Sequence, residues 1–371
     1  MVLFLLVSSI IYLALNYYIY SRITGGLNLS IRASKILLVF FILATFSFIP
    51  AEILSRHFEQ EWIRPFLYLS FTWLGVTSIA IAVFVIVDVL RIFIRLKKFR
   101  YYATVSALFL IALTSGYCLY NQAKNPVIKE IKIPVSKLPP AMNGFTVVQL
   151  SDLHLDMSKS ESFLKDLVLQ TLALKPDLIV ITGDMIDTDI CKLNDFCKIL
   201  KRLKAKYGVY AVTGNHEFYA GIPLFMEIAT NSDIRVLRNT NVLIADAIEL
   251  VGIDDAFSVK RFEKISVKES LLSAFKKVDF TKPVLLLSHQ PGVFDLARSM
   301  GADIQLSGHT HAGQLPPVDL LVQFLFKYPF GLYKKDTSYL YTTCGSAFWG
   351  PPMRMFSKPE IVKVILIAKK S

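Results

Sequence analysis

Four long apolar stretches near the start of the chain constrain its fold most, because each is suited to a lipid environment. They cover residues 2–20, 36–54, 66–90 and 102–120, each near or above the roughly 20 residues that an α-helix needs to cross a bilayer core. The first lacks the basic N-terminal region and the small-residue cleavage site of a signal peptide before Arg22, so we expect it to be retained. Residues 1–124 are therefore predicted to form a transmembrane region of about four helices.

Lysine and arginine residues in the short loops between these stretches predict the orientation of the chain, because basic loops usually stay on the cytoplasmic side. The first and third loops carry eight of them: Arg22, Arg32, Lys35, Arg91, Arg95, Lys97, Lys98 and Arg100. The second loop has only Arg56 and Arg64. We expect both chain ends, and the domain after residue 124, to lie outside the cytoplasm.

The formal net charge of +12 does not indicate nucleic-acid binding. More than half of it belongs to residues 1–124, where basic loops between apolar spans are expected. No basic stretch is interleaved with aromatic residues as in nucleic-acid-binding modules. The cysteines form no CxxC pair and do not indicate a redox compartment; they are Cys118, Cys191, Cys197 and Cys344.

Residues 125–371 show the pattern of a layered α/β domain. Short apolar runs typical of buried strands occur at residues 145–150, 178–181, 209–212, 284–287, 304–306, 340–343 and 361–367. Between the first three of them, residues 161–173 and 193–206 repeat apolar side chains every three or four positions, as amphipathic helices do. In sheets of this kind, reactive side chains gather just beyond the carboxyl ends of the strands.

Five of the six histidines follow directly after these runs. They lie in the segments Ser151-Asp152-Leu153-His154, Gly214-Asn215-His216-Glu217, Ser288-His289 and Gly308-His309-Thr310-His311, and a further carboxylate comes with Gly183-Asp184. The pairs Asp152/His154 and His309/His311 are two residues apart, which in an extended segment directs both side chains to one side. Carboxylate, imidazole and amide groups together suit divalent ions such as Mn, Fe, Zn or Co without choosing among them.

This set of motifs, in this order, resembles the calcineurin-like metallophosphoesterases over about residues 145–360. The resemblance implies an α/β/β/α sandwich-like domain with two divalent metal ions, manganese being one candidate. It implies one ion held by Asp152, His154, Asp184 and His311. It implies a second held by Asp184, Asn215, His289 and His309, with Asp184 bridging the two.

The resemblance also implies a mechanism in which a hydroxide that bridges the two metals attacks the phosphorus atom. The leaving group then needs a proton. His216, next to the ligand Asn215, is implied as the general acid, which makes both residues catalytic candidates. The alternative for His216 is an imidazole of the core or of the surroundings of the ligands. Glu217 is expected to be structural, as a carboxylate favoured at a helix N-terminus.

Two later segments bear on the substrate. Residues 316–333 are more apolar than a surface loop, as expected either of a segment that contacts membrane or acyl chains or of a core helix. Residues 345–354 look like the closing loop of the bacterial membrane-anchored subgroup of the family, which includes enzymes acting on phosphodiester or pyrophosphate bonds of envelope molecules and lipids. Arg354 in that loop is expected to bind a substrate phosphate or, alternatively, to pair with a surface carboxylate.

The sequence thus predicts a multi-pass integral membrane protein, in contact with the lipid bilayer, that hydrolyses phosphodiester, pyrophosphate or phosphomonoester bonds of an envelope or lipid-linked substrate. A cytoplasm-facing UDP-diacylglucosamine-type pyrophosphatase is an alternative, but it conflicts with the predicted orientation. A non-catalytic metal-binding membrane scaffold is a second alternative, disfavoured because no expected ligand is missing. A third makes the helices a transporter or channel that the phosphoesterase domain regulates, and Asp88 alone gives it little support. The oligomeric state is not indicated.

Overall fold

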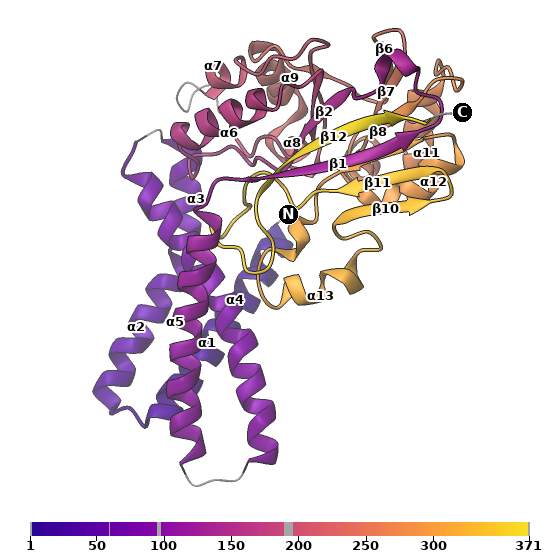
Figure 1. Ribbon diagram of the computed structural model, residues 1–371. Coiled ribbons are helices and arrows are strands. Elements are labelled where there is room, and N and C mark those ends of the chain that lie inside the picture. The colour runs from indigo at the N-terminus through magenta and orange to yellow at the C-terminus, as the bar shows by residue number, and fades with distance from the viewer. Residues whose placement is uncertain (1, 59, 95–97, 189–195, 370–371) are drawn as a thin grey trace. The chain divides into compact units, whose positions relative to one another are not determined.

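The computed structural model describes residues 2–58, 60–94, 98–188 and 196–369, and the chain forms two compact units (Figure 1). Unit 1 consists of Met1–Lys124 with two later segments, Gln314–Leu320 and Gly350–Phe356. Unit 2 consists of Asn125–Gly313, Leu321–Trp349 and Ser357–Ser371. Chain order alone assigns the two later segments to the second domain, whereas packing assigns them to the first unit.

The described residues of Met1–Lys124 form five helices: α1 (Val2–Leu27), α2 (Ile31–Phe46), α3 (Phe48–His57), α4 (Ile63–Phe93) and α5 (Phe99–Gln122). In the part of the chain that the structure describes, three helical stretches are long and apolar enough to cross a membrane: Ile31–Ser55, Ile63–Phe93 and Phe99–Gln122. They match the second to fourth predicted spans. The first predicted span forms α1, which is not among the three, so a fourth crossing stays a prediction.

The side chains of these helices fit a lipid environment. Large apolar groups such as Leu43, Leu69, Ile92 and Phe109 are exposed on the helices, and exposed apolar surface of this extent marks contact with lipid or another apolar partner. Two residues used to predict the orientation, Arg95 and Lys97, lie outside the described residues.

The helical hydrogen bonds of the second predicted span have a break at Ser47, between α2 and α3, although Ser47 itself keeps helical φ and ψ angles of −59° and −30°. Pro50, three residues later, has no N–H to donate to the carbonyl of Phe46, and its ring crowds that carbonyl. Proline therefore accounts for the break.

Asp88 pairs α4 with α1. Its carboxylate accepts a hydrogen bond from the Tyr18 hydroxyl at 2.7 Å and pairs with the Arg22 guanidinium at 2.7 Å. Arg91 lies 3.5 Å away on the same helix. A carboxylate with these partners is neutralised within unit 1, which favours a structural role over an ion path.

The strands in the described part of unit 2 form two six-stranded sheets. The first has the order β1 (Val127–Val135), β12 (Glu360–Ala368), β2 (Thr146–Leu150), β3 (Leu178–Thr182), β4 (Val209–Val212) and β5 (Arg235–Val236). The second has the order β10 (Gly331–Lys335), β11 (Ser338–Thr342), β9 (Ile304–Ser307), β8 (Val284–Leu287), β7 (Ile248–Gly252) and β6 (Thr240–Ile244). All seven predicted runs are strands, and in Figure 1 the long strands β1 and β12 lie side by side.

The sheets are layered as an α/β/β/α sandwich. One core joins inward side chains of both sheets, such as Val147 and Val180 from the first and Leu285 and Leu306 from the second. The neighbouring residue Val148 belongs instead to a core with helices of one outer layer, as the alternation of side chains along a strand requires. A further core packs α11 (Val267–Phe275) and α12 (Phe294–Ser299) on the other sheet. The expected fold class is confirmed.

The predicted helix at residues 161–173 is α6 (Glu161–Ala173), whereas the one at 193–206 is much shorter. Its described part is α7 (Phe196–Leu200), and residues 193–195 lie outside the described residues. The N–H groups of Arg202 and Leu203 bond to the carbonyls three residues earlier, which tightens the chain into turns. The helix prediction was therefore wrong for residues 201–206.

Candidate metal centre

The predicted metal ligands and His216 follow the carboxyl ends of five strands, β2, β3, β4, β8 and β9. Within each sheet these strands are parallel neighbours, so their carboxyl ends share one edge. The buried side chain of Gln149 links the two edges, because its amide donates to Thr182 Oγ1 at 2.9 Å and to the Ser307 carbonyl at 3.0 Å. The fold therefore gathers side chains from both sheets at one place.

The backbone at this place is strained. Five predicted ligands, Asp152, His154, Asp184, His309 and His311, have φ angles between 43° and 73°. Non-glycine residues adopt this left-handed region rarely, at a cost of about 1–3 kcal/mol each where surroundings impose it, and such residues cluster at functional sites.

Glycines let the strand ends approach closely. A Cβ on Gly183 would lie 2.6 Å from Nδ1 of His289, and one on Gly214 or Gly308 would overlap the carboxylate of Asp184 or Asp152. These three positions need glycine for space, which explains its presence in the motifs of the sequence.

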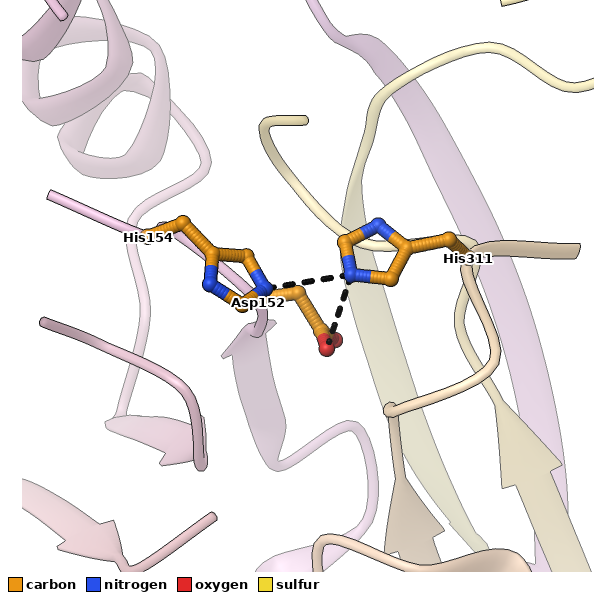
Figure 2. Close-up of side chains that lie close together, drawn as sticks. All are labelled: Asp152, His154 and His311. Carbon is orange, nitrogen blue, oxygen red and sulfur yellow. Dashed lines mark hydrogen bonds and ion pairs between the residues drawn. The ribbon is translucent and has the colours of Figure 1, made fainter. Parts of the chain in front are cut away.

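The first cluster consists of Asp152, His154 and His311 (Figure 2). The Nε2 atoms of His154 and His311 face each other at 3.1 Å, and His311 Nε2 lies 3.5 Å from Asp152 Oδ1. All three residues are buried.

The second cluster consists of Asp184, His289 and His309. His289 Nδ1 donates to the Thr182 carbonyl at 2.8 Å, which directs Nε2 toward Asp184 Oδ2 at 3.2 Å and His309 Nδ1 at 3.1 Å. Asp184 Oδ2 also lies 3.7 Å from His154 Nε2, so this one carboxylate faces both clusters. Burial alone would raise the pKa of Asp184, but His289, His216 and His154 outweigh it and hold that pKa well below its usual range.

Asn215 begins helix α8 (Asn215–Ala220). Its side-chain oxygen Oδ1 is buried and accepts no hydrogen bond within the described chain. A buried acceptor without a donor costs free energy, so the position suits an oxygen that binds a cation.

The donor atoms fit two divalent ions. Two pairs of imidazole nitrogens converge at 3.1 Å, about the separation of two nitrogens bound to one ion at roughly 2.1 Å. Buried carboxylates lie beside each pair, and Asp184 is placed between them. The structure thus brings six of the seven predicted ligands into two adjoining clusters.

His216 lies at the same edge and pairs with a residue that the motifs did not single out, Asp187. Asp187 Oδ1 lies 2.7 Å from His216 Nδ1 and 2.9 Å from His154 Nδ1. Burial alone would lower the pKa of His216, but Asp184 and Asp187 outweigh it and raise that pKa to about 9. Asp187 therefore orients both imidazoles and favours a protonated His216.

Asp187→Asn is expected to lower kcat about 10- to 100-fold, as removal of a partner that orients ligands typically does. The loss of the His216 ion pair should weaken proton donation, so hydrolysis of an alkyl phosphodiester should fall more than that of a para-nitrophenyl ester. Steady-state rates on both substrates measure the difference. An unchanged ratio of the two rates would contradict a role for Asp187 in proton transfer.

Glu217 is fully buried and structural. It accepts hydrogen bonds from four backbone N–H groups, those of Asp184, Met185, Ile186 and Gly214, at 2.6–3.1 Å. Burial and the Asp184 charge raise the pKa of Glu217 to about 7, and the backbone donors oppose this rise. The structural interpretation of Glu217 is confirmed, and its hydrogen bonds also hold the segment that carries Asp184.

Arg354 is not grouped with the other predicted site residues. It belongs to unit 1, its side chain is fully buried, and its carbonyl accepts a hydrogen bond from the Asn121 amide at 3.1 Å. Burial removes the guanidinium from solvent, and its contact with a substrate phosphate stays a prediction.

Exposed aromatic rings border His216. The Trp349 and Tyr219 rings lie 5.6 and 5.4 Å from it, both in edge-to-face arrangement, and both residues are half exposed. They offer apolar walls to a group bound beside His216.

Comparisons with known proteins agree with this geometry. A family model described as calcineurin-like phosphoesterase matches residues 145–313. A "transmembrane protein with metallophosphoesterase domain" from Danio rerio is 34% identical over 273 residues, which cover 71% of this chain and 62% of the relative. An uncharacterized metallophosphoesterase from Helicobacter pylori is 34% identical over 252 residues, which cover 67% and 66%. One from Aquifex aeolicus is 30% identical over 244 residues, which cover 65% and 92%. The chain therefore spans just under two thirds of the first two relatives and most of the third.

Proposed function

The chain belongs to the calcineurin-like phosphoesterase family, and from this premise we propose that it is a membrane-anchored, metal-dependent hydrolase of phosphoric esters. The observation that carries the proposal is the position of Asp184, whose one carboxylate faces both clusters of donor atoms. A shared carboxylate of this kind suits a pair of cations rather than a single structural ion.

Asp152, His154, Asp184 and His311 would hold one ion, and Asp184, Asn215, His289 and His309 the other. When bound, two such cations neutralise charge on phosphate oxygens and make a water nucleophile available near neutral pH. The ligand types accept Mn, Fe, Zn or Co, so the metal is set by supply rather than by these residues.

His216 would act as the general acid for the leaving group. Its Nδ1 is engaged by Asp187, which leaves Nε2 as the nitrogen able to donate to a leaving oxygen. The raised pKa keeps the ring protonated at neutral pH, as a proton donor must be. Asn215, one residue earlier, would help to hold the phosphate group in place through its amide.

The three helical stretches that are long and apolar enough to cross a membrane support a substrate located at the membrane, either an envelope molecule or a lipid-linked one. The eight basic residues of the first and third loops support a placement of unit 2 outside the cytoplasm. A cytoplasm-facing pyrophosphatase of the UDP-diacylglucosamine type would need the opposite orientation.

Metal dependence tests the proposed function directly. Detergent-solubilised protein with added manganese is expected to hydrolyse bis-para-nitrophenyl phosphate, to lose at least nine tenths of that activity with a chelator, and to regain it when the metal is restored. Release of para-nitrophenol measures the rate. Absence of turnover in metal-loaded protein would favour the non-catalytic scaffold instead.

A further inference from the structure

The segment that follows the last candidate ligands exposes large apolar side chains. They belong to helix α13 (Val318–Leu325) and to the chain after it: Leu321, Phe324, Leu325, Phe330 and Leu332. Phe324 and Leu325 are 79% and 64% exposed, and Val322 is the buried member of the helix. We call these five side chains the apolar ridge. A core helix is excluded by this exposure, and an apolar patch of this kind marks an interaction surface.

The residues that lead into α13 are bound to helices of the membrane-spanning type. Within unit 1, the Ser78 hydroxyl of α4 donates to the Pro316 carbonyl at 2.6 Å, and Leu315 lies in one apolar cluster with Ile79 and Ala80. Gly75, one turn earlier on α4, leaves room for Leu315 at 3.3 Å from the position of its missing Cβ. The entrance to α13 is therefore fixed to α4.

The other late segment of unit 1, Gly350–Phe356, indicates at which depth in the membrane this attachment lies. Arg354 N–H donates to the Cys118 carbonyl at 3.1 Å, and Asn121 donates to the Arg354 carbonyl, so the segment contacts the last turns of α5. The chain leaves the apolar helices at Gln122, hence that end of α5 belongs at a membrane surface. The 31 residues of α4 span about 46 Å, well over the roughly 30 Å of a hydrocarbon core, so α4 also extends beyond it.

The other end of the apolar segment reaches the metal centre. Within unit 2, the Phe326 ring lies 5.8 Å from the His309 ring in edge-to-face arrangement, and the Thr310 hydroxyl donates to the Pro329 carbonyl. One continuous stretch thus runs from an attachment on α4 to contact with a candidate metal ligand.

We propose that the apolar ridge lies in the head-group and upper acyl layer of the bilayer, and that it brings lipid-borne phosphate esters to the metal centre. The occupant is the bilayer itself, because the entrance to α13 is attached to helices that cross it. The substrate class rests on the proposed function, whereas the membrane contact stands without it.

Photocrosslinking tests the membrane contact without using activity. The full chain is placed in phosphatidylglycerol and phosphatidylethanolamine nanodiscs, with p-benzoylphenylalanine replacing Phe324 of the ridge, Phe109 of α5 or Phe257 of unit 2. These three side chains are 79%, 71% and 58% exposed. After irradiation, mass spectrometry is expected to detect phospholipid adducts at positions 324 and 109 and not at 257. No adduct at 324 beside a clear one at 109, or equal adducts at 324 and 257, overturns the contact.

Activity tests the substrate class with two esters that share one leaving group. Phosphatidyl-para-nitrophenol in vesicles is compared with soluble bis-para-nitrophenyl phosphate, for wild type, Phe324→Ser/Leu325→Ser and the control Phe257→Ser. The double variant is expected to lose at least tenfold in kcat/KM on the vesicle ester and to keep its rate on the soluble one. Equal loss on both esters, or none on the vesicle ester, overturns lipid delivery. Inactivity of wild type on both esters defeats the proposed function, while the crosslinking result still decides the membrane contact.

Discussion

Asp184→Asn is expected to lower kcat on bis-para-nitrophenyl phosphate by about 1,000-fold or more, which corresponds to about 4 kcal/mol of transition-state stabilisation. Asp184 Oδ2 faces His289 of one cluster and His154 of the other. Its Oδ1 accepts a hydrogen bond from the backbone N–H of His216 at 2.9 Å. The asparagine amide lacks the negative charge of Asp184 and replaces one carboxylate oxygen with an NH2 group, so the ligand that both ions would share is lost. Loss of a partner outside the ligand set typically costs about 10- to 100-fold, so loss of the shared ligand should exceed that range.

The measurement pairs kcat with metal content determined by plasma mass spectrometry. The variant should bind fewer than two equivalents, because it lacks the carboxylate that both ions would share. Asp233→Asn is the matched control, because Asp233 pairs only with the exposed Lys201 and Lys204 among the contacts described for it. That control should keep wild-type activity. An Asp184→Asn protein with two metals and more than a tenth of the activity would refute the shared-ligand role.

The strands that could be predicted from sequence are those buried on both faces. Leu178–Thr182 and Val209–Val212 are buried throughout, so their unbroken apolar runs carry the prediction. Strand β1 is different, since its first four residues are exposed and include Lys129 and Glu130. It becomes a strand through parallel pairing with β12, whose partner residues lie more than 200 positions away. The sequence pattern of residues 127–135 alone does not predict a pairing with so distant a strand.

The candidate ligands could be predicted for a related reason. Parallel strands place their carboxyl ends at one edge, so motifs that follow different strands are expected to meet there. The position of Asp187 depends instead on how two loops run together, through a bridge between Leu155 and Ile186. Its spacing of three residues from Asp184 was the available signal, and only the geometry shows that it serves two histidines.

Arg354 illustrates what sequence patterns could not supply. Residues 350–354 of its motif pack on α4 and α5 within unit 1, and the Arg354 side chain is buried. Attachment of residues 314–320 and 350–356 to helices more than 190 positions earlier depends on shape, since a Cβ at Gly75 would overlap Met353 Sδ. Packing between segments so far apart in the chain produces no periodic sequence pattern in either of them, so the sequence does not predict it.

Glu217→Ala is expected to destabilise unit 2 by about 3–6 kcal/mol, a large share of the roughly 5–15 kcal/mol that stabilises a typical domain. Four backbone N–H groups lose their acceptor, and each buried donor left unsatisfied costs about 1–3 kcal/mol before relaxation. The result does not depend on the protonation state of Glu217, because alanine offers no oxygen at all. Three of the donors belong to residues 184–186, so the backbone that positions Asp184 should become more mobile as well.

Thermal unfolding followed by near-ultraviolet circular dichroism measures the effect in detergent. For a unit of this size, 1 kcal/mol corresponds to about 2–4 °C, so the midpoint should fall by about 6–24 °C. Glu227→Ala is the matched control, since Glu227 is exposed on the neighbouring helix α9 (Ile222–Asn231) and should leave the midpoint unchanged. A midpoint for Glu217→Ala within 2 °C of wild type, whatever its activity, would mean that water replaces the carboxylate at no cost. In that case the strained ligand loop would owe its shape to the strands on either side rather than to Glu217.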